Sequence, residues 1–416
     1  MEMLLNEQKP LVMYVDFDSC FATIEQQAWF SARGRPLVVA AYDEAYGCVL
    51  SPSREAKKLG IKVGMRVKEA KQIYPKLIVK TPDPEKYRVV HEKFIALLQN
   101  YSPEVSSKSI DEAVLRFSSI EHLLKRPLID IALEIKERIK KEIGDWISCS
   151  IGIAPNQFLA KTASALHKPN GLDLITHQNV RAVLQRLKLI DLCGINVRYE
   201  RRLNAQGIYT PVEFLDAPLQ KLERQVFKSV CGYYWYLRLR GFEIDNVEFT
   251  RRSYGQSYAL SRQKDTPDNL QKILMKLCEK MGRRLRHSNH FAYGIHLSCS
   301  YVDGTYWHKG VSTPSSLFTT QDLYLAAKKI FLEQPGDLLT TGPNGQKGIV
   351  ILAVSCFNLK PRDFAQLELF ESEFSKKLRV SQAVDEINDR FGEYIVKPAL
   401  MINSDDVVVD RIAFGR

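Results

Sequence analysis

Two short acidic segments constrain most strongly what this chain can fold into and which chemistry it can carry out. Asp16 follows the apolar run Leu11–Val15, and the pair Asp111–Glu112 lies within the segment Ser109–Ala113. Each segment reads as a strand whose end delivers carboxylates to a common point. Three carboxylates at one point repel each other unless a hard dication lies between them, and Mg²⁺ held in this way can clamp the oxygens of a phosphoryl transfer. The sequence therefore predicts a nucleotidyl-transfer site, provided that the two segments meet in space.

Length and charge narrow the class of protein. A chain of 416 residues is too long for one typical core, so we expect two to four domains. No apolar run approaches the length that spans a bilayer, and the first ten residues lack a signal-peptide pattern, so we expect a cytoplasmic protein without a membrane partner.

The eight cysteines include no CxxC pair, which argues for reduced thiols and against a structural zinc site. The net charge of +11 suits a polyanion such as nucleic acid.

The first part of the chain, to about residue 175, reads as mixed α/β. Runs rich in β-branched residues predict strands at 11–15, 36–41, 113–117 and 147–153. Helical spacing of apolar residues predicts helices at 19–28, 53–59, 84–99, 128–143 and 156–167.

The pattern turns helical after residue 175, and a second α/β unit follows a polar linker. Within the helical part, residues 192–208 look like two short helices joined by a glycine turn. In the second unit we expect a basic helix at 270–287, strands at 292–301 and 348–356, and a hairpin loop at 340–347. A further helix is expected at 380–391.

Taken alone, the acidic residues have simpler explanations. Asp18 fits the N-cap of the helix that begins near Ser19, and Asp111–Glu112 fits a solvated turn. The residues around them favour a functional explanation. The junction Asp16–Phe21, the segment Ser109–Ala113, Phe158–Lys161 and Lys168–Gly171 together form a pattern that resembles the Y-family (translesion) DNA polymerases, over essentially the whole chain and most strongly from residue 11 to 171.

The resemblance implies an α+β multidomain fold, a right-hand polymerase with palm, small fingers, helical thumb and α/β little-finger domain. The implied divisions are a palm at 1–27 and 86–175, fingers at 28–85, a thumb with a helix-hairpin-helix at 176–242, a linker at 243–252, a little finger at 253–360 and a tail at 361–416.

The resemblance also implies the chemistry. Asp16, Asp111 and Glu112 would be the catalytic, metal-binding carboxylates, with the backbone carbonyl of Phe17 as a further ligand. The cofactor would be two Mg²⁺ ions, with Mn²⁺ as a substitute, and a primer 3′-OH would attack the α-phosphate of a dNTP. Asp18 is left out of the ligand set because its capping role suffices.

Phe21 matches the steric gate that excludes a 2′-OH, although an aromatic at this place can also be an ordinary core residue. The other residues that the resemblance assigns to nucleotide binding are Cys20, Ser51, Arg54, Lys57 and Lys168. Many relatives have Tyr and Arg where this chain has Arg54 and Lys57, and a Lys cannot reproduce a bidentate guanidinium. The start of this fingers segment resembles the catalytic subunit of DNA polymerase V, whereas Lys168–Gly171 looks like DNA polymerase IV, so the subfamily stays open.

The expected DNA contacts lie in two places. In the thumb, Gly194 and Asn196 would form a phosphate-binding hairpin in which Asn replaces the usual second Gly and tolerates left-handed backbone geometry. In the little finger, the basic residues would hold the duplex by its phosphates, although an exposed helix face explains them equally well. These residues are Arg283, Arg284 and Arg286.

The tail carries a short peptide that resembles the one by which bacterial polymerases dock on the sliding clamp. Its residues are Gln366, Leu367, Leu369 and Phe370. The competing explanation is the first turn of a packed helix. Accessory SOS subunits are further expected partners, and the residues after 370 have no assigned role.

The predicted function is a template-directed DNA polymerase of low fidelity that copies past damaged bases in DNA repair, with primer–template DNA and dNTP as substrates. One alternative is a non-catalytic scaffold that binds clamp and DNA, but such relatives lose the palm carboxylates that are present here. A nucleotide cyclase with a similar palm is a third reading, and it leaves the basic second unit unexplained.

Overall fold

The computed structural model describes residues 5–246, 250–260, 266–301, 303–334, 348–362, 373–392 and 394–402. The chain divides into two compact units, the first running to residue 248 and the second from 249 to 413. In the described ranges, no helix combines the length and the apolar composition that a membrane crossing requires.

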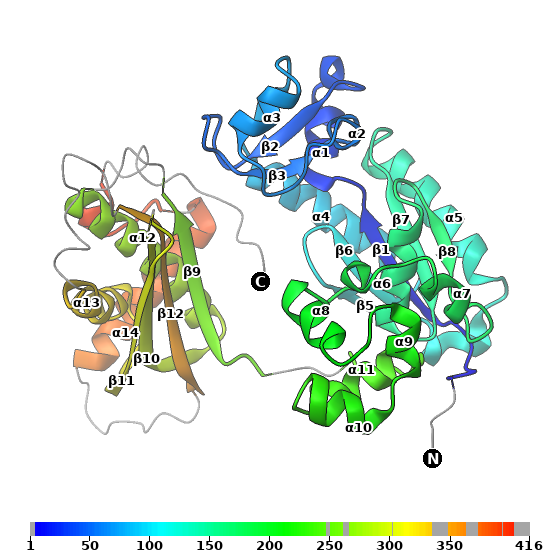
Figure 1. Ribbon diagram of the computed structural model, residues 1–416. Coiled ribbons are helices and arrows are strands. Elements are labelled where there is room, and N and C mark those ends of the chain that lie inside the picture. Colours follow the sequence, from blue (N-terminus) through cyan, green and yellow to red (C-terminus); the bar gives the residue numbers. More distant parts are fainter. Residues whose placement is uncertain are drawn as a thin grey trace. The chain divides into compact units, whose positions relative to one another are not determined.

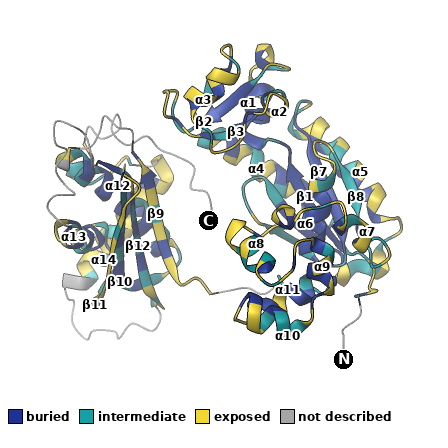
Figure 2. Ribbon diagram, in the orientation of Figure 1, coloured by how far each residue is buried: buried dark blue, intermediate teal, exposed yellow. Residues whose placement is uncertain are grey.

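The first unit is built on a five-stranded sheet with the order β5-β6-β1-β7-β8 (Figure 1). Its strands are β1 (Val12–Phe17), β5 (Glu104–Ser107), β6 (Glu112–Arg116), β7 (Cys149–Ala154) and β8 (Leu172–Leu174). The apolar run of β1 is buried along its whole length because it lies in the centre, antiparallel to β6 and to β7. Figure 2 shows these central strands as the buried part of the unit.

Three helices pack around this sheet. They are α4 (Pro84–Leu98), α5 (Leu128–Arg138) and α6 (Gln157–Leu166), of which α6 lies against β1 and β7. Gly152 permits the close approach of α6 to β7, because a Cβ there would lie 2.0 Å from the carbonyl oxygen of Ala160 and 2.3 Å from the amide nitrogen of Ser164. No side chain fits that gap, so the sequence fixes how closely α6 approaches the central strands.

A smaller subdomain of the first unit contains a three-stranded sheet with the order β3-β2-β4. Its strands are β2 (Leu37–Ala40), β3 (Val49–Pro52) and β4 (Ile78–Lys80). The neighbouring helices are α1 (Cys20–Ala28), α2 (Arg54–Lys58) and α3 (Val67–Ile73). Helix α1 contacts β2 and β3, and it follows directly on β1, so it links the two sheets.

Short helices complete the first unit. They are α7 (Val180–Leu184), α8 (Val197–Asn204), α9 (Pro211–Asp216), α10 (Leu219–Lys221) and α11 (Cys231–Leu239). Their apolar residues share one core with α6, in which Trp235 packs edge-on against Phe158 at 5.3 Å. The side-chain amide of Asn156 donates to the backbone carbonyls of Arg238 and Phe242, both at 2.9 Å. These contacts tie the short helices to the five-stranded sheet.

The second unit contains a four-stranded sheet with the order β11-β10-β12-β9. Its strands are β9 (Ser253–Ala259), β10 (His290–Tyr301), β11 (Tyr306–Leu317) and β12 (Ile349–Pro361). Its helices are α12 (Pro267–His287), α13 (Thr320–Leu332) and α14 (Glu373–Phe391). Along β10 buried and partly buried residues alternate for most of its length, as expected for a sheet with one covered face. Helices α12 and α13 supply the cover.

The predicted α+β class is confirmed, and most of the predicted elements lie close to the observed ones. Strands at 11–15 and 113–117 correspond to β1 and β6, and the helix at 156–167 corresponds to α6. The helix expected at 128–143 ends as α5 at Arg138 and continues as one π-helical turn, Ile139–Ile143. Strand β12 and helix α14 are longer than predicted. The hairpin loop expected at 340–347 lies outside the described residues.

Candidate active site

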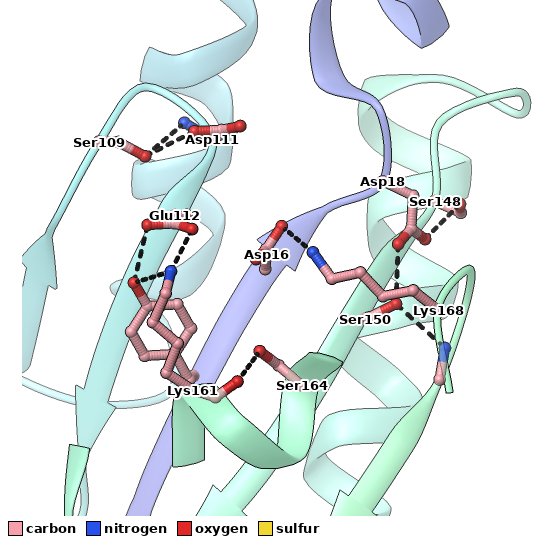
Figure 3. A network of polar contacts seen from close by, with 12 residues as sticks. Asp16, Asp18, Ser109, Asp111, Glu112, Ser148, Ser150, Lys161, Ser164 and Lys168 are labelled. Atoms are coloured by element: carbon pink, nitrogen blue, oxygen red, sulfur yellow. Dashed lines mark hydrogen bonds and ion pairs between the residues drawn. The ribbon is translucent and has the colours of Figure 1, made fainter. Parts of the chain in front are cut away.

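The two acidic segments meet at the end of the strand pair β1 and β6. Asp16 and Glu112 face each other across this antiparallel pair, so their side chains lie on the same side of the sheet. Asp111 directly precedes β6, and its carbonyl oxygen accepts a hydrogen bond of 3.0 Å from the amide of Phe17. Figure 3 shows the three carboxylates at this one end of the sheet.

Two lysines pair with two of the three carboxylates. The ammonium group of Lys168 lies 2.6 Å from Oδ1 of Asp16. Lys161 extends from α6, pairs with Glu112 and donates to the hydroxyl oxygen of Tyr14 at 3.1 Å. The Tyr14 hydroxyl donates in turn to Oε2 of Glu112 at 2.8 Å. Glu112 is therefore held by two donors from two different elements.

The two facing carboxylates differ in their electrostatics. Burial raises the pKa of Asp16 to about 6, although Lys168 acts in the opposite direction. Burial also acts to raise the pKa of Glu112, but the hydrogen bonds from Lys161 and Tyr14 outweigh it, and this pKa lies below its usual value. Of these two facing carboxylates, Asp16 is therefore the one whose charged form its surroundings stabilise less.

The donor set fits a hard dication. Carboxylate and carbonyl oxygens are the ligands that Mg²⁺ prefers. Over the described part of the chain, no three acidic, histidine or cysteine side chains are close enough together to hold a metal as they stand. The reason is visible in the contacts, because Glu112 turns toward Lys161 and Asp111 accepts a hydrogen bond of 2.5 Å from Ser109 Oγ.

Asp18 does not cap a helix, which corrects the sequence-based explanation. The N-cap position of α1 is Ser19, which has a φ of 53° and makes no side-chain capping bond. The carboxylate of Asp18 instead turns toward β7 and accepts hydrogen bonds from the hydroxyls of Ser148 at 2.7 Å and Ser150 at 2.8 Å. A third bond of 2.8 Å comes from the amide of Asn170. Asp18 stays outside the ligand set for this reason rather than as a cap.

Three predicted nucleotide-binding residues lie near the start of α1. Phe21 is 4% exposed and stacks on the ring of Tyr87, with centroids 4.5 Å apart and planes 14° apart. Cys20 is buried beside it, and burial raises the pKa of its thiol. The hydroxyl of Ser51 on β3 accepts a hydrogen bond of 3.4 Å from the amide of Ala22. Packing therefore fixes the ring of Phe21. This is expected both for a steric gate and for an ordinary core residue.

The two cations of α2 lie in different surroundings. Arg54 donates to the carbonyl of Trp146 at 3.1 Å and lies over its ring at 5.4 Å. Burial lowers the pKa of Lys57, and the charge of Lys168 lowers it further. Lys57 thus shares an electrostatic environment with Lys168 and Asp16, whereas Arg54 is engaged with Trp146.

The predicted thumb hairpin differs in detail from expectation. Gly194 has a φ of 97° and provides the left-handed turn. Asn196 does not adopt left-handed geometry, because its φ is −100° and its side chain caps α8 by accepting from the amides of Arg198 and Tyr199, both at 3.0 Å. The element before the turn is a short 3₁₀ helix, Leu189–Asp191, rather than an α-helix.

Two of the three arginines predicted to contact DNA are paired with α14. Arg283 pairs with Asp389 at 2.7 Å, and Arg286 pairs with Asp385 at 2.6 Å. Both arginine side chains are largely buried, so the exposed helix face is wrong for these two residues, while their DNA contacts stay a prediction. Arg284 points elsewhere, toward β9, and donates to the carbonyl of Gly255 at 3.2 Å.

The clamp-like peptide, with Gln366, Leu367, Leu369 and Phe370, lies outside the described residues. Sequence reasoning assigned no role to Tyr14 or Lys161, although Tyr14 lies two residues before Asp16 and therefore on the same face of β1. That spacing is the signal that identifies it. Lys161 gives no comparable signal, because its position depends on how α6 packs.

Comparisons with known proteins agree with this fold. The impB/mucB/samB family matches residues 15–165, and its C-terminal domain matches residues 251–369. A curated relative from Clostridioides difficile, "DNA polymerase IV", is 31% identical over 86% of this chain and 96% of its own length. Another of the same name, from Pelotomaculum thermopropionicum, is 29% identical over 96% of this chain and 97% of its own length.

A solved structure gives the same result for the fold. The "Y-family DNA polymerase chimera Dbh-Dpo4(243-245)-Dbh" superposes with a TM-score of 0.69 at 26% identity, and the match covers 84% of this chain and 99% of the other. The fold and the relatives are those of a DNA-directed DNA polymerase, so the prediction of an enzyme is confirmed. Within that class, the chain belongs to the impB/mucB/samB family, the Y-family of translesion polymerases.

Proposed function

We propose that this chain is a translesion polymerase of the DNA polymerase IV kind, which adds dNTPs to a primer 3′-OH and copies past damaged bases during DNA repair. The name shared by its relatives supports this subfamily over DNA polymerase V. The retained carboxylates argue against a non-catalytic scaffold. The relatives, which are DNA polymerases by name, argue against a nucleotide cyclase.

Asp16, Asp111, Glu112 and the carbonyl of Phe17 would hold two Mg²⁺ ions, with Mn²⁺ as a substitute. Ions held by these residues would supply a lowered pKa for the primer 3′-OH and positive charge for the triphosphate. Asp16 would be the central residue of this ligand set, because it lies opposite Glu112 and next to the backbone contact between Phe17 and Asp111.

The chain's own cations complete the nucleotide site. Lys168 and Lys57 would bind the triphosphate. Lys168 lies 2.6 Å from Asp16, and the charges of Asp18 and Asp16 both act on Lys57. Phe21 would exclude a ribose 2′-OH with its ring held flat by Tyr87. Cys20 and Ser51 would line the same pocket, and Arg54 would reach it by leaving Trp146.

We further propose the palm, fingers, thumb, linker, little-finger and tail divisions given above for the first and second units. Gly194 and the amides that follow Asn196 would contact DNA phosphates, and Arg284 is the arginine of α12 that best suits this role. The sliding clamp would bind the peptide 366–370, and accessory SOS subunits would be further partners.

One observation carries the proposal: Asp16 and Glu112 face each other at the end of β1 and β6, and Lys168 and Lys161 neutralise them. The test is primer extension with Mg²⁺ on an undamaged and on an abasic template. We expect the wild type to extend on both, and the variant Asp111→Ala/Glu112→Ala to extend on neither. If the wild type extends no primer with Mg²⁺ or Mn²⁺, the proposal is wrong, and if it stops at the abasic site, only lesion bypass is wrong.

A further inference from the structure

We infer that Asp18 is a positioning residue for Lys168, the lysine that we propose binds the triphosphate. The inference concerns the loop Lys168–Gly171, which joins α6 to β8 and carries this lysine. It rests on the proposed role of Lys168.

Asp18 is 3% exposed and lies between β1 and α1. Its Oδ2 accepts from the Ser148 hydroxyl and from the amide of Asn170, while Oδ1 accepts from the Ser150 hydroxyl. An ionised carboxylate only accepts hydrogen bonds, so its two oxygens suit these three donors. The bonds compensate for burial of the charge.

The loop is held at successive amides. The amide of Asn170 donates to Asp18, and the amide of Gly171 donates to Ser150 Oγ at 3.2 Å, which itself donates to Asp18. From the other side, the ammonium group of Lys136 donates to the carbonyls of Asn170 at 2.6 Å and Gly171 at 3.1 Å. Figure 3 shows Asp18 and Ser150 beside the strand that follows the loop.

This anchoring determines where Lys168 lies. Lys168 is two residues from the anchored amide of Asn170, and its ammonium group lies 2.6 Å from Asp16. Asp18 belongs to the same segment as Asp16, so one short stretch of chain supplies both the metal-binding carboxylate and the anchor of the lysine.

Asp18→Asn tests the inference, because the amide retains the volume but replaces one acceptor oxygen with a donor. We expect KM for dNTP to rise about tenfold, on the order of one hydrogen bond to a charged group, with a smaller change in kcat. Thr23→Val is the matched control. It removes the 2.7 Å bond from Thr23 to the Asp18 carbonyl in the same turn but leaves the loop contacts in place.

A double-mutant cycle separates positioning from general destabilisation. In a Lys168→Ala background, Asp18→Asn should raise KM for dNTP by less than twofold, because residues that act through one another are not additive. If the full tenfold rise persists in that background, Asp18 does not act through Lys168 and the inference is wrong.

Hydrogen exchange of the metal-free protein gives a readout that needs no polymerase activity. Peptides that contain residues 168–171 should lose protection in Asp18→Asn and keep it in Thr23→Val. Unchanged protection in Asp18→Asn overturns the inference, even if the enzyme is an active polymerase. Lost protection in a protein that extends no primer would instead uphold the anchoring and contradict the proposed function.

Discussion

Helix α14 is joined to α12 by a buried ion pair whose removal has a calculable cost. Nε of Arg286 donates to Oδ2 of Asp385 at 2.6 Å and Nη2 donates to Oδ1 at 2.8 Å. The two side chains are only 8% and 11% exposed. Nη1 has other acceptors, the carbonyl of Phe318 at 3.0 Å and Thr320 Oγ1 at 3.4 Å.

The substitution Asp385→Ala leaves the guanidinium of Arg286 buried with two nitrogens unpaired. Breaking such a pair costs about 3–5 kcal/mol. Because Phe318 and Thr320 still accept from Nη1, we expect the lower end, about 3 kcal/mol of unfolding free energy. For a unit of this size, 1 kcal/mol corresponds to about 2–4 °C, so the melting temperature of the second unit should fall by about 6–12 °C.

Differential scanning calorimetry of the full chain measures this shift, and two controls identify its cause. The double variant Arg286→Met/Asp385→Leu removes both charges and should recover most of the loss, because apolar replacement of a buried pair is often neutral. Asp216→Ala breaks a pair with Arg181 whose side chains are 52% and 50% exposed, and it should cost less than about 1 kcal/mol. If the double variant is as unstable as Asp385→Ala, the unpaired charge is not the cause and the reasoning fails.

Three further predictions concern the polymerase. Phe21→Ala should raise ribonucleotide incorporation in primer extension, because the space beneath the sugar opens; unchanged sugar discrimination would count against the gate. Lys161→Met should lower kcat about tenfold with little change in KM for dNTP, because Glu112 loses a charge-assisted partner; equal kcat in the variant would contradict this role. Leu369→Ala/Phe370→Ala should abolish clamp binding in a pull-down with the purified clamp, and retained binding would exclude the peptide.

Much of the fold was predictable because local patterns agree with the final packing. The apolar run before Asp16 became the buried central strand β1, and the helical spacing in 128–143 became α5. The start of α14 was missed, because the first half of this helix has no strong apolar pattern and the helix is therefore longer than expected.

The site was predictable only in part. The carboxylates stand at the ends of strands, so Asp16 and Glu112 could be placed together before the pairing was known. The role of Asp18 was not predictable, because its partners lie 130 residues or more away in sequence. The arginines of α12 likewise gave no sign that acidic residues of α14 would cover them.

The lysines of the first unit have a consequence for folding. Lys161 and Lys168 place two positive charges among the carboxylates, so the protein supplies its own counter-charges. Zinc-dependent domains, by contrast, draw their folding free energy from the ion and unfold when it is removed. A chelator should therefore stop nucleotide transfer by this chain while leaving its melting temperature nearly unchanged, which makes the supply of ions a control on activity and not on the amount of folded protein.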